Sequence, residues 1–330
     1  MQEKIMGVKI IGTGSYLPSQ ILNNLDLEKI VDTSDEWIKA RTGICERRIA
    51  HQKEASSDLA VKAGRLALES ANISPDEIDL IVVATATPDM PFPSTACFIQ
   101  KGLKAFSSAC FDVSAACSGF LYALTIGEQF IKSGFYKTVL VVGAETFSRI
   151  IDWTDRNTCV LFGDGAGACI LKNGKDNQGI MAFDLGTDSR ASELLMVPGG
   201  GSRNPINAHL LENRLQFIKM KGNDVFKHAV KHLVSSARNV LKKSHMVAQD
   251  IDLVIPHQAN IRIIEAISGR LDIPITKFFI NLDKYGNTSA ASIPIALDEA
   301  VKSGRVKKDD NVLLAAFGGG LVWGSCILKW

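Results

Sequence analysis

The amino-acid sequence predicts an α/β fold that is built from two similar halves. The segment Glu77–Val82 matches Asp250–Ile255, and each match follows an amphipathic helical pattern. Further along, Ile131–Gly134 matches Val301–Gly304 at a slightly shorter offset. Matches that recur in the same order indicate a duplicated structural unit. We therefore expect two halves, which comprise residues 1–173 and 174–330.

Each half alternates short apolar runs with helical patterns. The runs that we expect to form strands are Leu80–Ala84, Val139–Val142, Leu253–Ile255 and Val312–Phe317. Amphipathic helices are expected at Ser57–Ala71 and Asp224–Leu241. Continuous apolar strands that alternate with helices indicate mostly parallel sheets, which are buried on both faces. We expect two such sheets, related by a pseudo-twofold axis, in a five-layer αβαβα arrangement.

The composition indicates a compact globular protein. Of the 330 residues, 46% are hydrophobic and 22% are charged, and the formal net charge is +2. This charge is too small to predict binding to nucleic acid or to a membrane surface, so a basic binding site must be a local patch. The longest uncharged run, Asn311–Leu328, is interrupted by Gly318–Gly320. We interpret that run as two strands around a turn rather than as a membrane span.

The seven cysteines predict neither a disulfide framework nor a metal site. Their number is odd and no two of them form a CxxC pair, whereas paired cysteines at regular spacing are typical of disulfide-rich domains and zinc sites. A reducing cytoplasm is therefore the expected location.

The segment Phe111–Leu121, FDVSAACSGFL, carries the candidate nucleophile. It begins as an apolar strand, turns through small residues and places Cys117 at the first turn of a buried helix. Unpaired backbone N–H groups and the positive end of the helix dipole favour the thiolate, which is the nucleophilic form of cysteine. We predict a reactive thiolate at Cys117; a buried structural cysteine is the alternative.

The internal repeat connects Cys117 with two further polar residues. When the halves are aligned on Ile131–Gly134 and Val301–Gly304, the shorter offset, Cys117 corresponds to Asn287. When they are aligned on Glu77–Val82 and Asp250–Ile255, the longer offset, the end of the strand Leu80–Ala84 corresponds to His257. Ligands of open α/β sheets bind outside the carboxyl ends of the strands. We therefore expect Cys117, His257 and Asn287 to share one site. Taken alone, a histidine at a strand end is more often structural, and an asparagine beside a glycine is typical of a turn.

Three consecutive glycines, Gly318–Gly320, follow the predicted strand Val312–Phe317. Glycines let a ligand approach the backbone N–H groups closely. They would form either an oxyanion hole or a tight hairpin turn.

Ten motifs occur in order along nearly the whole chain: GTGSYLP, DEWIKARTGI, ERRIA, ATATPDMPFPSTAC, DVSAACSGF, RNTCVLFGDGAGA, MKGNDVFK, PHQANIRI, GNTSAAS and FGGGLVWGS. Together they closely resemble the β-ketoacyl-acyl-carrier-protein synthase III family of the thiolase superfamily. The resemblance implies a thiolase-like duplicated fold. It also implies decarboxylative Claisen condensation of an acyl-CoA starter with malonyl-acyl-carrier-protein. The 3-oxoacyl-acyl-carrier-protein product would initiate type II fatty acid synthesis, and no metal or redox cofactor would be needed.

The resemblance also implies catalytic roles. Cys117 would be the nucleophile that becomes acylated, and His257 and Asn287 would form the decarboxylation pair. The backbone N–H groups of Cys117 and Gly319 would form the oxyanion hole.

Binding residues are implied in the same way. The coenzyme A residues would be Trp37, Arg41, Arg156, Gly222, Asn223 and Asn260. The acyl pocket would contain Phe92, Leu161 and Phe317, with Phe92 reaching into the pocket of a partner subunit, so that a homodimer would be the working unit. Leu321 departs from the aromatic residue that many members have after the glycines, which leaves the pocket's shape open. Docking of the carrier protein would involve Gln258, Ala259, Asn260, Ile261 and Arg262. Lys227 adds a positive charge to the expected patch, because its expected helix directly precedes the His257 strand.

Three alternatives remain open from the sequence. A synthase-III-like enzyme of secondary metabolism or with long-chain substrates would carry the same motifs. A Cys-His-Asn thiol hydrolase would carry the three residues in the same order. An inactive dimerisation partner would normally have lost its nucleophile, whereas all three groups are present here.

Overall fold

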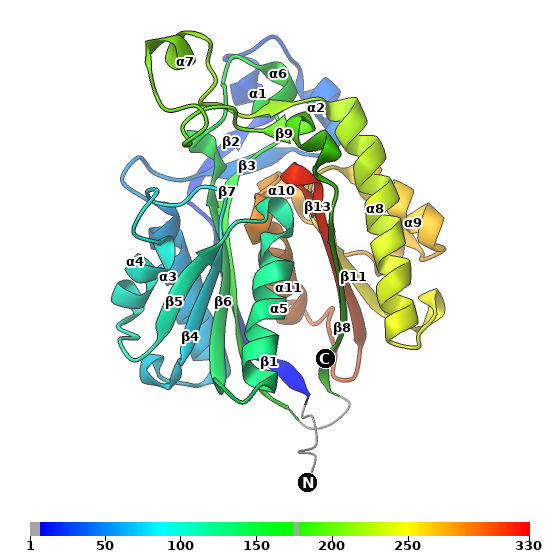
Figure 1. Cartoon of the computed structure of the whole chain (residues 1–330). Helices are drawn as coiled ribbons and strands as arrows, with labels where there is room; N and C mark the ends of the chain where they lie inside the picture. Colours follow the sequence, from blue (N-terminus) through cyan, green and yellow to red (C-terminus); the bar gives the residue numbers. More distant parts are fainter. Residues whose placement is uncertain (1–6, 175–177) are drawn as a thin grey trace.

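The computed structural model describes residues 7–174 and 178–330 and contains two large sheets that face each other (Figure 1). The first sheet has five strands in the order β1 (Val8–Tyr16), β7 (Asp164–Asn173), β6 (Thr138–Thr146), β4 (Leu80–Ala84) and β5 (Ala109–Val113). The second has four strands in the order β11 (Leu253–Pro256), β12 (Asn311–Gly318), β13 (Val322–Lys329) and β8 (Gly179–Thr187). The strands of each sheet therefore come from one half of the sequence.

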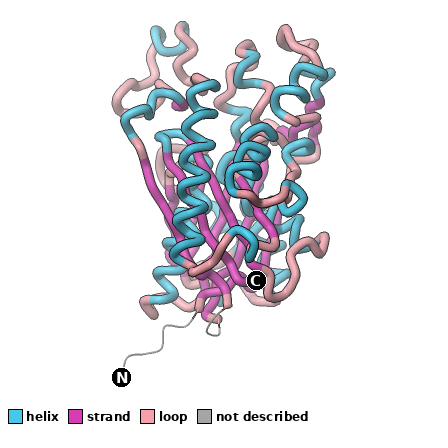
Figure 2. Tube along the Cα trace, turned by 90° about the vertical axis from the view of Figure 1, so that its right-hand side faces the viewer, coloured by secondary structure: helices cyan, strands magenta, loops and turns pink. Residues whose placement is uncertain are grey.

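Helices complete the predicted five layers. The helices α5 (Gly119–Lys132) and α11 (Ser292–Lys302) lie between the sheets (Figure 1). The outer helices are α3 (Ser56–Ala71) and α4 (Thr95–Leu103) on the first sheet, and α8 (Gly222–Lys243) and α9 (Ile261–Leu271) on the second. Figure 2 is viewed from the side of α8 and α9, with the strands behind them. The thiolase-like αβαβα fold is confirmed.

Burial on both faces explains the apolar runs Leu80–Ala84 in β4 and Val139–Val142 in β6. Every residue of β4 and β6 is buried. A fully buried Val, Leu or Ile side chain contributes about 1.5–3 kcal/mol relative to an exposed one. A polar residue within these strands would lose that contribution and would need a hydrogen-bond partner.

The sheets are mixed, so the prediction of mostly parallel sheets was wrong. Strand β4 pairs in parallel with β5 and β6, but β7 runs antiparallel to both β1 and β6. In the second sheet, only β11 and β12 are parallel. An apolar run shows that a strand is buried on both faces but not in which direction its neighbour runs.

The backbone conformation before α5 repeats before α11. This repeat corrects the alignment between the two halves that was expected from the sequence at these helix starts. Ala116 and Ser289, which correspond at the longer offset of the repeat, both have positive φ, at 45° and 49°. They begin the short 3₁₀ helices η2 (Ala116–Ser118) and η7 (Ser289–Ala291), which lead into α5 and α11. The structural counterpart of Cys117 is therefore Ala290 rather than Asn287. The change of offset arises later, because α5 has 14 residues and α11 has 11.

Shorter elements gather at one end of the sheets (Figure 1). They are β2 (Gln20–Asn23), α1 (Asn24–Leu27), α2 (Asp35–Thr42), β3 (Glu46–Ile49), α6 (Arg156–Cys159), β9 (Leu195–Met196), α7 (Ala208–Glu212), β10 (Lys219–Met220) and α10 (Leu282–Tyr285). Within the described ranges, no helix is both long and apolar enough to cross a membrane.

Candidate active site

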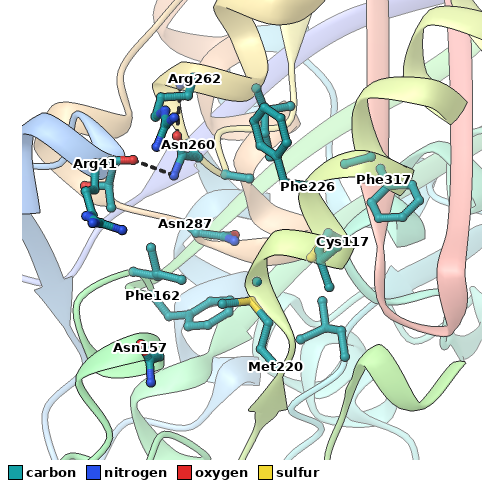
Figure 3. A pocket seen from close by; sticks show the side chains of 18 of the residues that line it. Arg41, Cys117, Asn157, Phe162, Met220, Phe226, Asn260, Arg262, Asn287 and Phe317 are labelled. Atoms are coloured by element: carbon teal, nitrogen blue, oxygen red, sulfur yellow. Dashed lines mark hydrogen bonds between the residues drawn. The ribbon is translucent and has the colours of Figure 1, made fainter. Parts of the chain in front are cut away.

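One cavity of about 550 Å³ brings the three predicted catalytic residues together. Cys117, His257 and Asn287 all line it, although they lie far apart in the sequence. Cys117 and His257 follow the carboxyl ends of β5 and β11, and Asn287 precedes η7 and α11. In Figure 3 the Asn287 carboxamide points toward the side of the cavity that holds Cys117.

Cys117 is buried, and its burial opposes the thiolate that its position at a helix start predicts. The residue lies in η2, directly before α5, and is only 5% exposed. Burial is the main reason that the pKa of the thiol is raised to about 12; the Ser289 hydroxyl lowers this pKa, and the Glu145 carboxyl contributes to raising it. The loss of hydration outweighs the helix terminus here. The proton must therefore leave Cys117 during the reaction rather than before it.

Glycine allows the end of β12 to approach the nucleophile. A Cβ atom on Gly318 would lie 2.6 Å from the backbone nitrogen of Cys117, so a larger residue would displace one of the two segments. Gly320 has φ +98°, a conformation that favours glycine. The glycines also join β12 to the antiparallel β13, so they form a hairpin turn beside the nucleophile.

His257 is held by the backbone ladder at the end of β11. Its N–H donates to the carbonyl of Ala315 over 2.8 Å, next to the last pair of the parallel ladder with β12. Burial lowers the pKa of the imidazole to about 3, so the ring is neutral at physiological pH. Its Nδ1 atom has no hydrogen-bond partner among the described residues.

Asn287 is fixed by backbone and side-chain bonds. Its N–H donates to Leu161 over 2.8 Å, and its carbonyl accepts from Gly163 over 3.0 Å. Its Oδ1 accepts from the backbone N–H of Ser289 over 2.8 Å. Because the oxygen is used in this way, the amide nitrogen is left to donate into the cavity. Asn287 and His257 can therefore both act as neutral hydrogen-bond donors.

The predicted coenzyme A residues lie along this cavity and at its edge. Those that line it are Trp37, Arg41, Gly222, Asn223 and Asn260. The guanidinium carbons of Arg41 and Arg156 lie 5.0 and 4.9 Å from the centre of the Trp37 ring. Asn260 donates to the carbonyl of Arg41 over 2.9 Å and so ties α9 to α2 (Figure 3). Arg156 donates to the carbonyl of Asp32 rather than lining the cavity.

Comparison with known proteins identifies the family of this site. Residues 111–189 match the family model of 3-oxoacyl-[acyl-carrier-protein] synthase III, and residues 241–330 match that of its C-terminal part. The curated β-ketoacyl-[acyl-carrier-protein] synthase III of Caldanaerobacter subterraneus subsp. tengcongensis is 55% identical over 330 residues, which cover 100% of this chain and 99% of that protein. The chain belongs to the β-ketoacyl-[acyl-carrier-protein] synthase III family.

Other relatives agree with this assignment. The synthase III of Clostridioides difficile is 52% identical over 322 residues, 97% of this chain and 98% of that protein. The crystal structure of the Aquifex aeolicus synthase III is 52% identical, has a TM-score of 0.92 and covers 98% of this chain and 100% of its own. The priming β-ketosynthase of the R1128 polyketide pathway is 36% identical, with a TM-score of 0.91 and coverage of 98% and 96%. The chain is therefore an acyl-transferring condensing enzyme, and the family acts in fatty acid synthesis.

The acyl-pocket residues expected from the synthase III family divide into two groups. Leu161 and Phe317 line the cavity. Phe92 is 84% exposed and does not line the cavity of its own chain. Leu321 is fully buried in the hydrophobic core and is also outside the cavity lining.

The prediction that Gln258 takes part in docking of the carrier protein was wrong. Gln258 is only 1% exposed, and its amide donates to the carbonyls of Pro256 and Phe279. It therefore supports the His257 loop and cannot meet a partner. Arg262 and Lys227 are exposed, and Arg262 also lines the cavity. Ile261 packs against Gly43, with its side chain half-buried.

Sequence reasoning missed the apolar wall of the cavity. That wall includes Val160, Phe162, Leu195, Met220, Val225, Phe226, Ala229, Leu233 and Ile263. The signal for part of it was present, because Phe226, Ala229 and Leu233 recur at helical spacing along α8. Val160, Phe162, Leu195 and Met220 gave no such signal, because they lie in loops or very short elements that follow no period.

Proposed function

We propose that this cavity accepts a short acyl-CoA and then malonyl-acyl-carrier-protein, and condenses them on Cys117. The observation that carries the proposal is the convergence of one thiol and two neutral donors, His257 and Asn287, on one cavity. An acyl-transfer step needs the thiol, and a decarboxylation step needs the donors.

In the first half-reaction, the Cys117 sulfur attacks the thioester carbon of the acyl-CoA. We propose that neutral His257 accepts the thiol proton and returns it to the departing coenzyme A sulfur. The backbone N–H groups of Cys117 and Gly319 would stabilise the negative oxygen of the tetrahedral intermediate. The products are the acyl-cysteine and coenzyme A, so no proton is gained or lost overall.

In the second half-reaction, the malonyl thioester loses carbon dioxide, and its electron pair becomes an enolate. Hydrogen bonds from His257 and the Asn287 amide would stabilise the enolate oxygen without protonating its carbon. That carbon attacks the acyl-cysteine, and the Cys117 sulfur leaves as a thiolate, which takes up a proton from solvent to restore the thiol. This chemistry requires neither a metal nor a redox cofactor.

Relatives that are 48–55% identical carry the synthase III name, which favours the initiation of fatty acid synthesis over a specialised pathway. In a Cys-His-Asn thiol hydrolase the asparagine would orient the histidine ring, whereas His257 Nδ1 has no hydrogen-bond partner among the described residues. The proposal and this alternative differ in their products.

The decisive experiment supplies acetyl-CoA and malonyl-acyl-carrier-protein to the wild-type protein. We expect a 3-oxobutanoyl-acyl-carrier-protein, seen by intact mass spectrometry. A panel of longer and branched acyl-CoAs would then define the starter. Free acetate, with no carbon–carbon bond formed, would contradict the proposal and favour the hydrolase.

We propose that the protein works as a homodimer. Phe92 is 84% exposed, and β5 forms the edge of its sheet, with β4 as its single partner in the sheet. An apolar side chain and an unpaired strand edge are both stabilised by contact with a second copy. Sedimentation as a monomer at micromolar concentration would contradict this proposal.

We propose a cytoplasmic location. All seven cysteines lie in the described part of the chain as free thiols, which suits a reducing compartment. Recovery of the native protein only from secreted fractions would contradict it.

Docking of the acidic carrier protein would depend on exposed positive charge near the cavity. Arg262 is exposed and lines the cavity, and Lys227 has only a 3.6 Å contact with Asp224. Charges at an exposed rim act mainly on association rates and salt dependence. We expect Arg262→Glu to raise the KM for malonyl-acyl-carrier-protein and flatten its salt dependence, and to leave acylation by acyl-CoA nearly unchanged.

Lys242→Glu provides the matched control, because Lys242 is an exposed α8 residue that does not line the cavity. This variant should leave both the KM for malonyl-acyl-carrier-protein and acylation by acyl-CoA unchanged. If Arg262→Glu reduces activity equally with both substrates, Arg262 supports the cavity itself.

A further inference from the structure

The carboxyl group of Glu145 is a buried acceptor between two loops of the active site. The residue lies near the end of β6 and is 0% exposed. Its carboxylate accepts from Thr85 Oγ1 at 3.3 Å, Ala86 N at 3.0 Å, Thr87 N at 3.1 Å, Thr87 Oγ1 at 2.6 Å and Ala290 N at 3.3 Å. The first four donors belong to the loop after β4, and the last belongs to the turn that begins with Asn287.

These partners require a carboxylate rather than an amide. Every group that bonds Glu145 is an N–H or O–H donor. A glutamine would direct its NH₂ group at some of these donors and leave them without an acceptor, which is costly in a buried site. Burial raises the pKa of Glu145 to about 7, and the hydrogen bonds act in the opposite direction.

The turn 287–290 is joined to this carboxylate at its Ala290 end by one hydrogen bond of 3.3 Å, whereas its Asn287 end is held by Leu161 and Gly163. The turn lies directly on β6, where a Cβ atom on Gly143 would meet the Ala290 carbonyl oxygen at 2.3 Å. Ser289, within the turn, has φ +49° and donates its N–H to Asn287 Oδ1. A shift of Ala290 would therefore move the hydrogen bond that orients the Asn287 carboxamide.

The nucleophile has separate supports. The Ser118 hydroxyl donates to the carbonyl of Val322 over 2.9 Å, and Gly318 packs against the Cys117 backbone. These contacts involve β12 and β13 of the second half rather than the loops that Glu145 joins. Glu145 acts on Cys117 through its charge, which raises the pKa of the thiol, so its loss should favour ionisation of Cys117 while it removes a hydrogen bond from the Asn287 turn.

We propose that Glu145 is a positioning residue for the decarboxylation half-reaction, because it fixes the turn that aims the Asn287 donor at the enolate oxygen. This inference rests on the proposed function, and it assigns Glu145 no contact with substrate. It predicts that the two half-reactions respond differently when the carboxylate is removed.

The test compares both half-reactions in Glu145→Gln. Acylation of Cys117 by acetyl-CoA is followed by intact mass, and release of carbon dioxide from malonyl-acyl-carrier-protein is followed separately. We expect decarboxylation to fall about 10- to 100-fold, as for a misplaced catalytic group, and acylation to fall far less. Glu145→Asp retains an acceptor and should recover part of the decarboxylation rate.

Asp298→Asn is the matched control. Asp298 is also 0% exposed and accepts from Thr13 Oγ1 at 2.9 Å and Ser15 Oγ at 2.6 Å, but it does not line the cavity. Its loss should lower the Tm and leave the ratio of the two half-reactions unchanged. An unchanged ratio in Glu145→Gln, or in Glu145→Asp if the glutamine variant does not fold, would overturn the inference. Wild-type protein that performs neither half-reaction would instead contradict the proposed function.

Discussion

Cys117→Ala is expected to abolish transfer of the acyl group from acyl-CoA to the protein. The sulfur is the atom that forms the covalent intermediate, and no neighbouring group can replace it. Intact mass after incubation with acetyl-CoA should show an added acetyl group on the wild type and none on the variant. Condensation should be lost with it, and wild-type kinetics should follow a ping-pong pattern.

Cys159→Ala is the appropriate control for this experiment. Cys159 is fully buried, and burial raises the pKa of its thiol to about 11. It does not line the cavity, in contrast to Cys117. The control should therefore acylate normally. An adduct that persists in Cys117→Ala, or that maps to Cys110 or Cys159, would contradict the assignment of the nucleophile.

Replacing either donor with alanine should reduce decarboxylation on the order of 10²-fold or more, the usual cost of one lost oxyanion donor. The two variants should differ in the first half-reaction. In Asn287→Ala, Cys117 should become acylated at nearly the normal rate, because Asn287 takes no part in moving the thiol proton. His257→Ala should also slow acylation, since the buried Cys117 thiol then lacks its proton acceptor.

The measurement is single-turnover acylation beside carbon dioxide release for each variant. His209→Ala serves as the control, because His209 is exposed and lies outside the cavity lining. If His257→Ala acylates as fast as the wild type, another group accepts the proton. If it eliminates acylation as fully as Cys117→Ala, His257 is an obligatory base.

The catalytic residues were predictable because they stand where strands end and helices begin. Cys117 and His257 follow apolar runs whose positions repeat, and the repeat survives as duplicated backbone geometry at Ala116 and Ser289. Asn287 was found through an offset that the structure does not support at that point. Its place in the site depends on bonds to Leu161 and Gly163, in the other half of the chain.

Other features could not be predicted because they depend on tertiary burial. The charge state of Cys117 follows from the depth of its surroundings, which helix position alone does not reveal. Gln258 looks exposed in a polar stretch, yet the fold encloses it. Glu145 sits within a continuous buried strand, and its importance depends on donors that lie 58 to 145 residues away in the sequence.

The protonated state of Cys117 bears on the chemical durability of the protein. Peroxides and alkylating agents react with thiolates far faster than with thiols. Because burial raises the pKa of the Cys117 thiol, it should slow the reaction with such reagents while the cavity is empty. The reactivity of the thiol develops only when a thioester carbon and a proton acceptor are both in place. The same burial that slows ionisation thus protects the sulfur from irreversible oxidation between turnovers.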